Sequence, residues 1–155
     1  MPLTVEQRVA IVKEAHSWLG TPYRGHCHFK GPHGGADCGQ FLAAVYVEAD
    51  VLPESIWSTI PRDYSLQVSM HQESTEYIDL ISRFFRLIPE SEVLPGDVVV
   101  YKFGFAYAHA AIIIDWPAHV IHSFGRHGVS GAHGKKTPKF HRAQRLFFTV
   151  KDSYC

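Results

Sequence analysis

Apolar residues recur at helical spacing through the first half of the chain. The first such pattern predicts an amphipathic helix over residues 5–19, which ends at Gly20. Its apolar stripe consists of Val5, Val9, Val12, His16 and Leu19. Thr4 and Gln7 have the spacing of a capping box at the start of this helix. The segment from residue 21 to residue 36 is expected to be a loop.

Two further helices are predicted after this loop. The first begins at Cys38 and ends before Pro53, with apolar positions at Phe41, Leu42, Val45, Tyr46 and Ala49. A polar, proline-punctuated connection then runs from Pro53 to about Gln72. The next helix is predicted over residues 75–87, with buried positions at Tyr77, Ile78, Ile81, Phe84 and Phe85.

The pattern changes from Pro95 onward, where segments rich in β-branched and aromatic residues are separated by Gly, Pro, Asp and Lys. Such segments are typical of antiparallel strands joined by turns. The predicted strands are Asp97–Phe103, Ala108–Ile114, Val120–Phe124 and Arg145–Val150. The chain is therefore predicted to have an α+β fold, with its helices in the N-terminal half and the sheet after them.

Length and charge narrow the possible functions. The 155 residues contain no repeat or shift in composition, so a single domain, residues 1–155, is expected. Lysine plus arginine and aspartate plus glutamate both number 15, so no charge excess favours nucleic acid or an anionic membrane as a partner. No secretory signal or membrane-spanning run is visible, so we expect synthesis in the cytoplasm, with delivery in a virion or release by lysis. Three cysteines are too few for a disulfide framework, and at least one free thiol is expected.

Cys38 is the strongest candidate for a reactive residue, because it stands where a glycine-rich loop gives way to a helical pattern. The N-terminus of a helix has unpaired N–H groups and partial positive charge. These favour a thiolate and can lower a cysteine pKa from about 8.5 toward roughly 3.5–7.5. Cys38 is therefore predicted to be a nucleophile, and the alternative is a buried structural cysteine.

Two histidines lie on neighbouring predicted strands. If residues 115–118 form a four-residue hairpin loop, Ile114 pairs with His119 and the numbers of cross-strand partners sum to 233. His109 and His122 then project from the same face of the sheet, about 7–8 Å apart at the backbone, within reach of a hydrogen bond between their rings. A loop one residue longer or shorter would place them on opposite faces.

Together these residues supply what thiol catalysis needs. Cys38 would attack a carbonyl, His109 would hold the proton and return it to the leaving amine, and His122 would orient the His109 ring. The backbone N–H of Cys38 is expected to meet the oxyanion.

Five short blocks follow one another along the chain. They are Gly20-Thr21-Pro22-Tyr23, Asp37-Cys38-Gly39-Gln40-Phe41, Leu94-Pro95-Gly96-Asp97-Val98, His109-Ala110-Ala111-Ile112 and Val120-Ile121-His122. In this order they resemble the signature of the NlpC-type cysteine peptidases, the papain-like endopeptidases of the bacterial cell wall. The resemblance reaches at least Val129. Residues 125–129, with their Gly-Val pair, are similar to the short phage-encoded branch associated with tail assembly.

This resemblance implies a papain-like fold with the nucleophile at a helix N-terminus on the antiparallel sheet, and no cofactor. It also implies hydrolysis of a peptidoglycan stem peptide, usually between D-γ-glutamate and a diamino acid such as meso-diaminopimelate. By position, Cys38 corresponds to the nucleophile, His109 to the base and His122 to the polar third member. Tyr23 matches a tyrosine that contacts the oxyanion or substrate. Asp37 matches an acidic residue that binds a substrate amine, and a helix N-cap is the equal alternative.

Three features depart from that pattern or lie outside it. Gly39 and Gln40 replace the Ser-Gly pair that usually follows the nucleophile. The His26–His33 loop holds three histidines and Cys27, so a structural metal site is considered beside a groove wall or a solvated loop. A basic segment is expected to be a solvated face, or a contact for anionic wall polymer or a tail partner. It comprises Lys135, Lys136, Lys139, His141, Arg142 and Arg145.

Three functions therefore stay open. The leading prediction is a cysteine endopeptidase with a peptidoglycan stem peptide as its partner. The alternatives are a non-enzymatic structural component of a phage tail, which would bind tail proteins, and a metal-binding module that uses the His26–His33 loop.

Overall fold

The computed structural model describes residues 2–61 and 75–154. The α-helices are α1 (Val5–Ser17), α2 (Cys38–Glu48), α4 (Glu76–Ile81) and α5 (Pro138–His141). The strands are β1 (His28–Phe29), β2 (Gly35–Ala36), β3 (Phe85–Ile88), β4 (Val98–Phe103), β5 (Ala106–Asp115), β6 (His119–Phe124), β7 (Gly128–Ala132) and β8 (Arg145–Val150). Short 3₁₀ helices lie at Glu54–Thr59, Glu90–Glu92, Gly125–His127 and Asp152–Tyr154. Within the described ranges, every helix is too short or too polar to cross a membrane.

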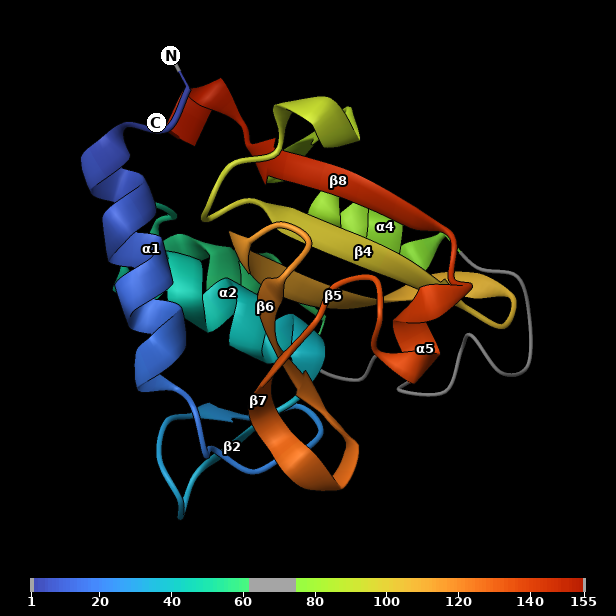
Figure 1. The fold of residues 1–155 in the computed structure, drawn as a ribbon. Coiled ribbons are helices and arrows are strands. Elements are labelled where there is room, and N and C mark those ends of the chain that lie inside the picture. The colour runs from blue at the N-terminus through green and yellow to red at the C-terminus, as the bar shows by residue number, and fades with distance from the viewer. Residues whose placement is uncertain (1, 62–74, 155) are drawn as a thin grey trace.

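A six-stranded antiparallel sheet forms the centre of the structure, in the order β3-β8-β4-β5-β6-β7 (Figure 1). β1 and β2 form a separate hairpin. Helix α2 contacts both β5 and β6, and α1 packs beside α2 (Figure 1). This arrangement confirms the predicted α+β, papain-like class, with Cys38 as the first residue of a helix that packs on the sheet.

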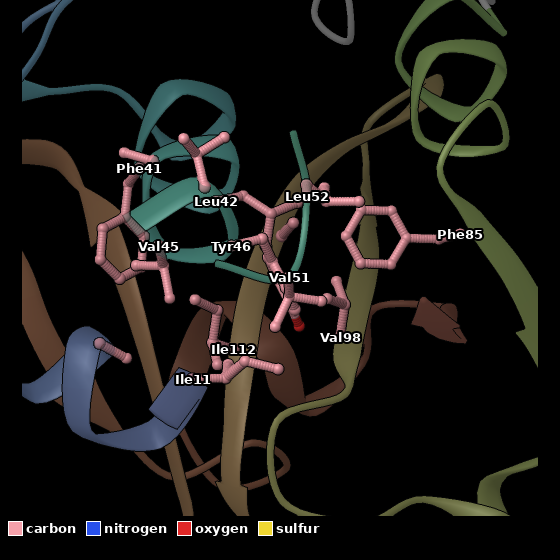
Figure 2. Packing of buried hydrophobic residues seen from close by; sticks show 14 of the residues in the cluster. Ile11, Phe41, Leu42, Val45, Tyr46, Val51, Leu52, Phe85, Val98 and Ile112 are labelled. Atoms are coloured by element: carbon pink, nitrogen blue, oxygen red, sulfur yellow. The ribbon is translucent and has the colours of Figure 1, made fainter. Parts of the chain in front are cut away.

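Alternate residues of the central strands fill two separate apolar clusters. On one face, Val98 and Ile112 pack with Ile11 of α1 and with the apolar side of α2 (Figure 2). That side includes Phe41, Leu42, Val45 and Tyr46. On the opposite face, Val99 and Tyr101 pack with the second cluster, which includes Phe140 of α5, Ala111, Ile113 and Phe147. The period of two along β4 and β5 thus places α2 and α5 against opposite faces.

The turn before β4 fastens the helices to the sheet. The buried carboxylate of Asp97 accepts hydrogen bonds from Arg8 of α1 at 2.9 Å and from Thr149 of β8 at 2.6 Å. The hydroxyl of Tyr46 on α2 donates to the carbonyl of Gly96. Since a buried carboxylate must keep its partners, these contacts fix α1 and α2, and with α2 the position of the nucleophile.

The buried side of α1 differs from the prediction. The helix and its capping box are confirmed, because Thr4 Oγ1 accepts the N–H of Gln7 at 3.1 Å. However, Val5 is 73% and Val9 is 61% exposed, so the predicted apolar stripe faces outward. The buried positions are Ile11, Ala15 and Trp18. The prediction was wrong because apolar residues occur on two sides of this helix, and the side with the larger Ile and Trp side chains is the one buried.

The predicted third helix is also shorter than expected. α4 ends at Ile81, and from Phe85 the chain forms β3, which pairs with β8. Phe84 and Phe85 are buried as predicted, but strand pairing overrides the helical period after Ile81. β7 and the β1–β2 hairpin were not predicted, because β1 and β2 have only two residues each and β7 contains two glycines, so these strands carry little pattern. Residues 62–72 of the predicted connection lie outside the described residues.

The β5–β6 hairpin reaches the predicted register through a different turn. The pairs next to the turn are Ile112 with Ile121, Ile113 with Val120, and Asp115 with His119. The first two pairs follow the predicted sum, but the third does not, because the loop is one residue shorter than expected. The predicted pair of Ile114 with His119 is therefore wrong. A β-bulge between Ile113 and Asp115 absorbs the difference, so His109 and His122 still share a face.

Candidate active site

A cavity of about 770 Å³ lies where the turn from β4 to β5 meets the start of α2, with α4 and α5 as further walls. Cys38 and His109 both line it, together with Tyr23 and Asp37. His122 contacts His109 from within the sheet. The structure therefore brings the five residues singled out from the sequence to one place.

Asp37 is the N-cap of the helix that carries Cys38. Its Oδ1 accepts the N–H of Gln40 at 2.9 Å, and its Oδ2 accepts the N–H of His26 at 2.6 Å. The side chain is 1% exposed. The capping alternative is thus confirmed, and the carboxylate also ties the preceding loop to the start of the helix.

The Cys38 sulfur lies against the backbone of β5. Among the described residues, its thiol donates to the carbonyl oxygen of Ala108 at 3.7 Å, and the hydroxyl of Tyr77 donates to the sulfur at 3.8 Å. Ala108 immediately precedes His109, and both Cys38 and His109 line the cavity. Loose contacts of this kind are common before a substrate binds.

The surroundings raise the pKa of the Cys38 thiol to about 11. Burial is the main cause and the Asp37 carboxylate is the second, whereas the Tyr77 hydroxyl and the N–H groups of Ala110 and Gly39 lower the pKa. The prediction of a resting thiolate is therefore wrong, because lost hydration and a neighbouring carboxylate outweigh the partial charge of the helix. At neutral pH the sulfur carries its proton, and attack requires a base.

His109 and His122 form a buried pair that can supply this base. Nε2 of His109 lies 2.8 Å from Nδ1 of His122, and the two residues are 3% and 6% exposed. Burial holds the pKa of His109 well below its ordinary value, and His122 and Lys139 lower it further. Burial is also the main cause that lowers the pKa of His122 to about 4. Both rings are neutral at pH 7, and a neutral imidazole can accept a proton.

Tyr23 lines the same cavity as Cys38 and keeps its phenolic proton at neutral pH. Burial raises the pKa of Tyr23 to about 12, and the charges of Cys38 and Asp37 add to this shift. The segment that carries Tyr23 is held tightly, since a Cβ on Gly128 would lie 2.2 Å from the carbonyl oxygen of Thr21. Gly128 also has a positive φ of 60°. Glycine is therefore favoured at this position both by the close contact and by the backbone conformation.

Tyr77 is a site residue that the sequence analysis placed only among buried helix positions. Its ring reaches the cavity from α4, and a Cβ on Gly39 would lie 3.5 Å from its Cε2 atom. A methyl group at position 39 would therefore be in ordinary van der Waals contact with this ring. An aromatic residue in an amphipathic pattern does not by itself distinguish the core from a site.

The His26–His33 loop lies against the start of α2 without gathering its histidines. His28 stacks on Trp57 with ring centroids 3.9 Å apart, and its Nδ1 lies 2.8 Å from Oε1 of Gln40. Gln40, the second departure from the usual block, therefore anchors this loop. Residues 2–61 and 75–154 contain no group of three or more His, Cys, Asp or Glu side chains that could hold a metal ion. Cys27 and Cys38 are both free thiols.

The basic segment divides between the surface and the cavity. Lys136, His141 and Arg142 are exposed, as expected of a solvated face. Lys139 lines the cavity, which Lys102 at the end of β4 also does. Part of a segment expected to be solvated thus belongs to the site.

The sequence matches no protein-family model, and a search of curated proteins finds no match. Solved structures do share the fold. A lipoprotein-like protein of the NLP/P60 family from Staphylococcus aureus superposes on 97% of this chain, with a TM-score of 0.65 and 18% identity. The chain spans 43% of that protein's length.

Two further structures superpose on this chain over almost the whole length of both chains. The NlpC/p60 domain of the peptidoglycan hydrolase SagA matches 93% of this chain and 98% of its own, with a TM-score of 0.53 and 19% identity. RipD from Mycobacterium tuberculosis, described as a non-catalytic NlpC/p60 domain protein adapted to peptidoglycan binding, matches 94% and 97%, with a TM-score of 0.55 and 13% identity. The fold is thus that of NlpC/P60 domains. Because such domains include a hydrolase and a non-catalytic protein, the residues of the site must decide the activity.

Proposed function

We propose that the chain is a cysteine endopeptidase that hydrolyses peptidoglycan stem peptides between D-γ-glutamate and a diamino acid. The observation that carries this proposal is the placement of Cys38 and His109 on one cavity, with His109 bonded to His122 at 2.8 Å. A peptidoglycan hydrolase among the structural neighbours supports the substrate class. The five sequence blocks that resemble NlpC-type peptidases support the choice of bond.

The first step is attack by sulfur with transfer of its proton. When Nε2–H of His109 donates to Nδ1 of His122, Nδ1 of His109 keeps a free lone pair and acts as the base. The Cys38 proton moves to this nitrogen as the sulfur bonds to the carbonyl carbon. His122 holds the ring in this tautomer and stabilises the imidazolium that forms.

The carbonyl oxygen gains negative charge in this step. The backbone N–H of Cys38, at the first position of α2, has no acceptor within the helix, and Tyr23 supplies a protonated hydroxyl from the lining of the same cavity. As the intermediate collapses, the bond from carbon to nitrogen breaks and His109 gives its proton to the leaving amine. In the second step His109 takes a proton from water as the water oxygen bonds to the thioester carbon. The bond from carbon to sulfur then breaks, and His109 returns the proton to the sulfur.

Mass spectrometry of defined stem peptides tests this proposal. Incubation with the wild type is expected to give one pair of fragments whose masses sum to the substrate plus one water and identify the bond. Cys38→Ala is expected to lower the rate by on the order of 1,000-fold or more. Cys27→Ala is the matched control, because it removes the other described free thiol and leaves the cavity intact.

Three results are distinguishable. Cleavage by Cys38→Ala at the wild-type rate would contradict thiol catalysis, and cleavage at another bond would correct the specificity. Binding of stem peptides without cleavage by any variant would instead favour a non-catalytic role such as that described for RipD. Association with a phage tail remains a prediction that a pull-down with tail proteins would test.

A further inference from the structure

The leaving side of the substrate can be located from the proposed reaction, on which this inference rests. His109 gives its proton to the leaving amine, so the amine must stand next to the His109 ring. The residue that carries this amine therefore occupies the part of the cavity around His109. The side chains found there determine the specificity for the diamino acid that is released.

Aromatic rings flank His109 in this region. The Phe103 ring is nearly parallel to the imidazole with centroids 5.4 Å apart, and the Phe124 ring meets it edge to face at 4.9 Å. Both phenylalanines line the cavity. They offer an apolar surface to the methylene groups of a leaving residue.

A cation lies over one ring of this apolar surface. The ammonium of Lys139 lies 4.4 Å from the centroid of the Phe124 ring, which itself touches His109. Lys139 also lowers the pKa of His109, as a nearby positive charge must. Lys102 lines the same cavity, with its ammonium 5.9 Å from the Tyr107 ring.

The positive charges of Lys139 and Lys102 are not neutralised by a salt bridge within the described residues. Other lysines do form salt bridges, since Lys135 pairs with Glu90 at 2.8 Å and Lys30 with Glu14 at 2.6 Å. The acidic groups of the cavity come from other elements. Asp37 caps α2 and is committed to two N–H groups, and Glu76 belongs to α4.

We propose that Lys139, supported by Lys102, forms an anion subsite for a free carboxylate on the leaving diamino acid. The fitting substrate has its released amine at His109, an aliphatic chain along Phe103 and Phe124, and a carboxylate beyond it. meso-Diaminopimelate has this chemistry, because three methylene groups separate its two amino-acid centres. A lysine-containing stem peptide has a similar chain but lacks the second carboxylate.

A comparison of two matched peptides tests the subsite. The values of kcat/KM are measured at pH 8 for peptides that differ only in diaminopimelate or lysine after D-γ-glutamate. The wild type is expected to prefer diaminopimelate by about fivefold or more at low salt, with the preference shrinking as salt rises. Lys139→Met is expected to remove most of this preference, and Lys139→Glu to reverse it.

Lys136→Met is the matched control, because Lys136 is exposed in the same basic segment and outside the cavity lining. It is expected to keep the wild-type preference. Equal cleavage of both peptides by the wild type, or an equal loss on both with Lys139→Met, would overturn the subsite while the peptidase stands. Absence of cleavage of either peptide by the wild type would instead overturn the proposed function. Alkylation of Cys38 in each variant, followed by mass spectrometry, checks that the cavity is intact.

Discussion

The cavity has two sides that are built from different kinds of structure. The reactive side consists of Cys38, His109 and His122, which come from α2 and the central strands β5 and β6. The outer side consists of Tyr77, Lys102 and Lys139, which come from the six-residue α4, the end of β4 and the four-residue α5. Both histidines of the reactive side are buried, whereas Lys139 is exposed.

This difference separates the chemistry from the choice of substrate. Residues of the reactive side are held by sheet pairing and core packing, so a change there disturbs groups that cannot relax. Residues of the outer side stand on short helices or at the end of a strand, where substitution alters contacts without altering the fold. We therefore expect changes on the reactive side to lower kcat for every substrate, and changes on the outer side to alter rates modestly or selectively.

The largest expected effect is the loss of the base. His109→Ala is expected to lower kcat/KM by on the order of 1,000-fold on all stem peptides, because the protonated thiol then has no proton acceptor. The measurement is the rate of fragment release at pH 8. His119→Ala is the matched control, since His119 lies on the same hairpin but outside the cavity lining. A loss below tenfold for His109→Ala would show that another group takes the proton.

The second effect is the dependence on pH. Burial lowers the pKa of His109 well below its ordinary value and that of His122 to about 4, so the neutral base persists into mildly acid solution. We expect the acid midpoint of kcat/KM to lie below 6.5, with about a tenfold loss per pH unit beneath it. Catalysis is expected to continue to about pH 9, because the thiol must be protonated at rest and its pKa is about 11.

The lowered pKa values of the two histidines also make the folded state less stable as the pH falls. The unfolded histidines bind protons near pH 6.5, and the folded pair resists protonation, so the stabilisation is complete above about pH 6.5. It is lost as the pH falls from about 6.5 toward the folded pKa of about 4 for His122. Urea unfolding of the wild type at pH 7.5 and pH 5 measures this loss, which we expect to be on the order of 1–3 kcal/mol.

The pH profile of activity tests the same assignment. An acid midpoint of kcat/KM at or above pH 6.5 would contradict a buried neutral pair of histidines.

The reactive side could largely be predicted from the sequence, because its residues sit in regular elements. A helix after a glycine-rich loop placed Cys38, and the alternation of two strands placed His109 and His122 on one face. The predicted hairpin loop was wrong, although the two histidines share a face, because the bulge beside Ile114 compensates for a shorter turn. Nothing in the apolar pattern distinguishes a four-residue loop from a three-residue loop with a bulge. The state of the thiol was also missed, since burial depends on the whole fold.

The outer side could not be predicted, because its residues meet only through tertiary packing. Tyr77 looked like a core position, and Lys139 looked like one of several solvated charges. Phe85 fitted a helical period, yet pairing with β8 places it in a strand. Local pattern gives each residue a propensity, and the contacts between short elements decide its role.

The smallest expected effect belongs to Tyr77, and it distinguishes a hydroxyl that assists the thiol from a ring that only packs. The Tyr77 hydroxyl donates to Cys38 Sγ at 3.8 Å and lowers the thiol pKa.

Tyr77→Phe removes this hydrogen bond and keeps the ring beside Gly39. The thiolate fraction should fall, so alkylation of Cys38 by iodoacetamide at pH 9 is expected to slow by about three- to tenfold. kcat is expected to fall by no more than this factor with KM unchanged, because a less acidic thiol gives its proton to His109 less readily. Tyr107→Phe is the control, since its hydroxyl lies outside the cavity lining. The pH profile of alkylation decides the matter, because a packing role leaves that profile in place whereas a hydrogen bond to sulfur shifts it toward higher pH.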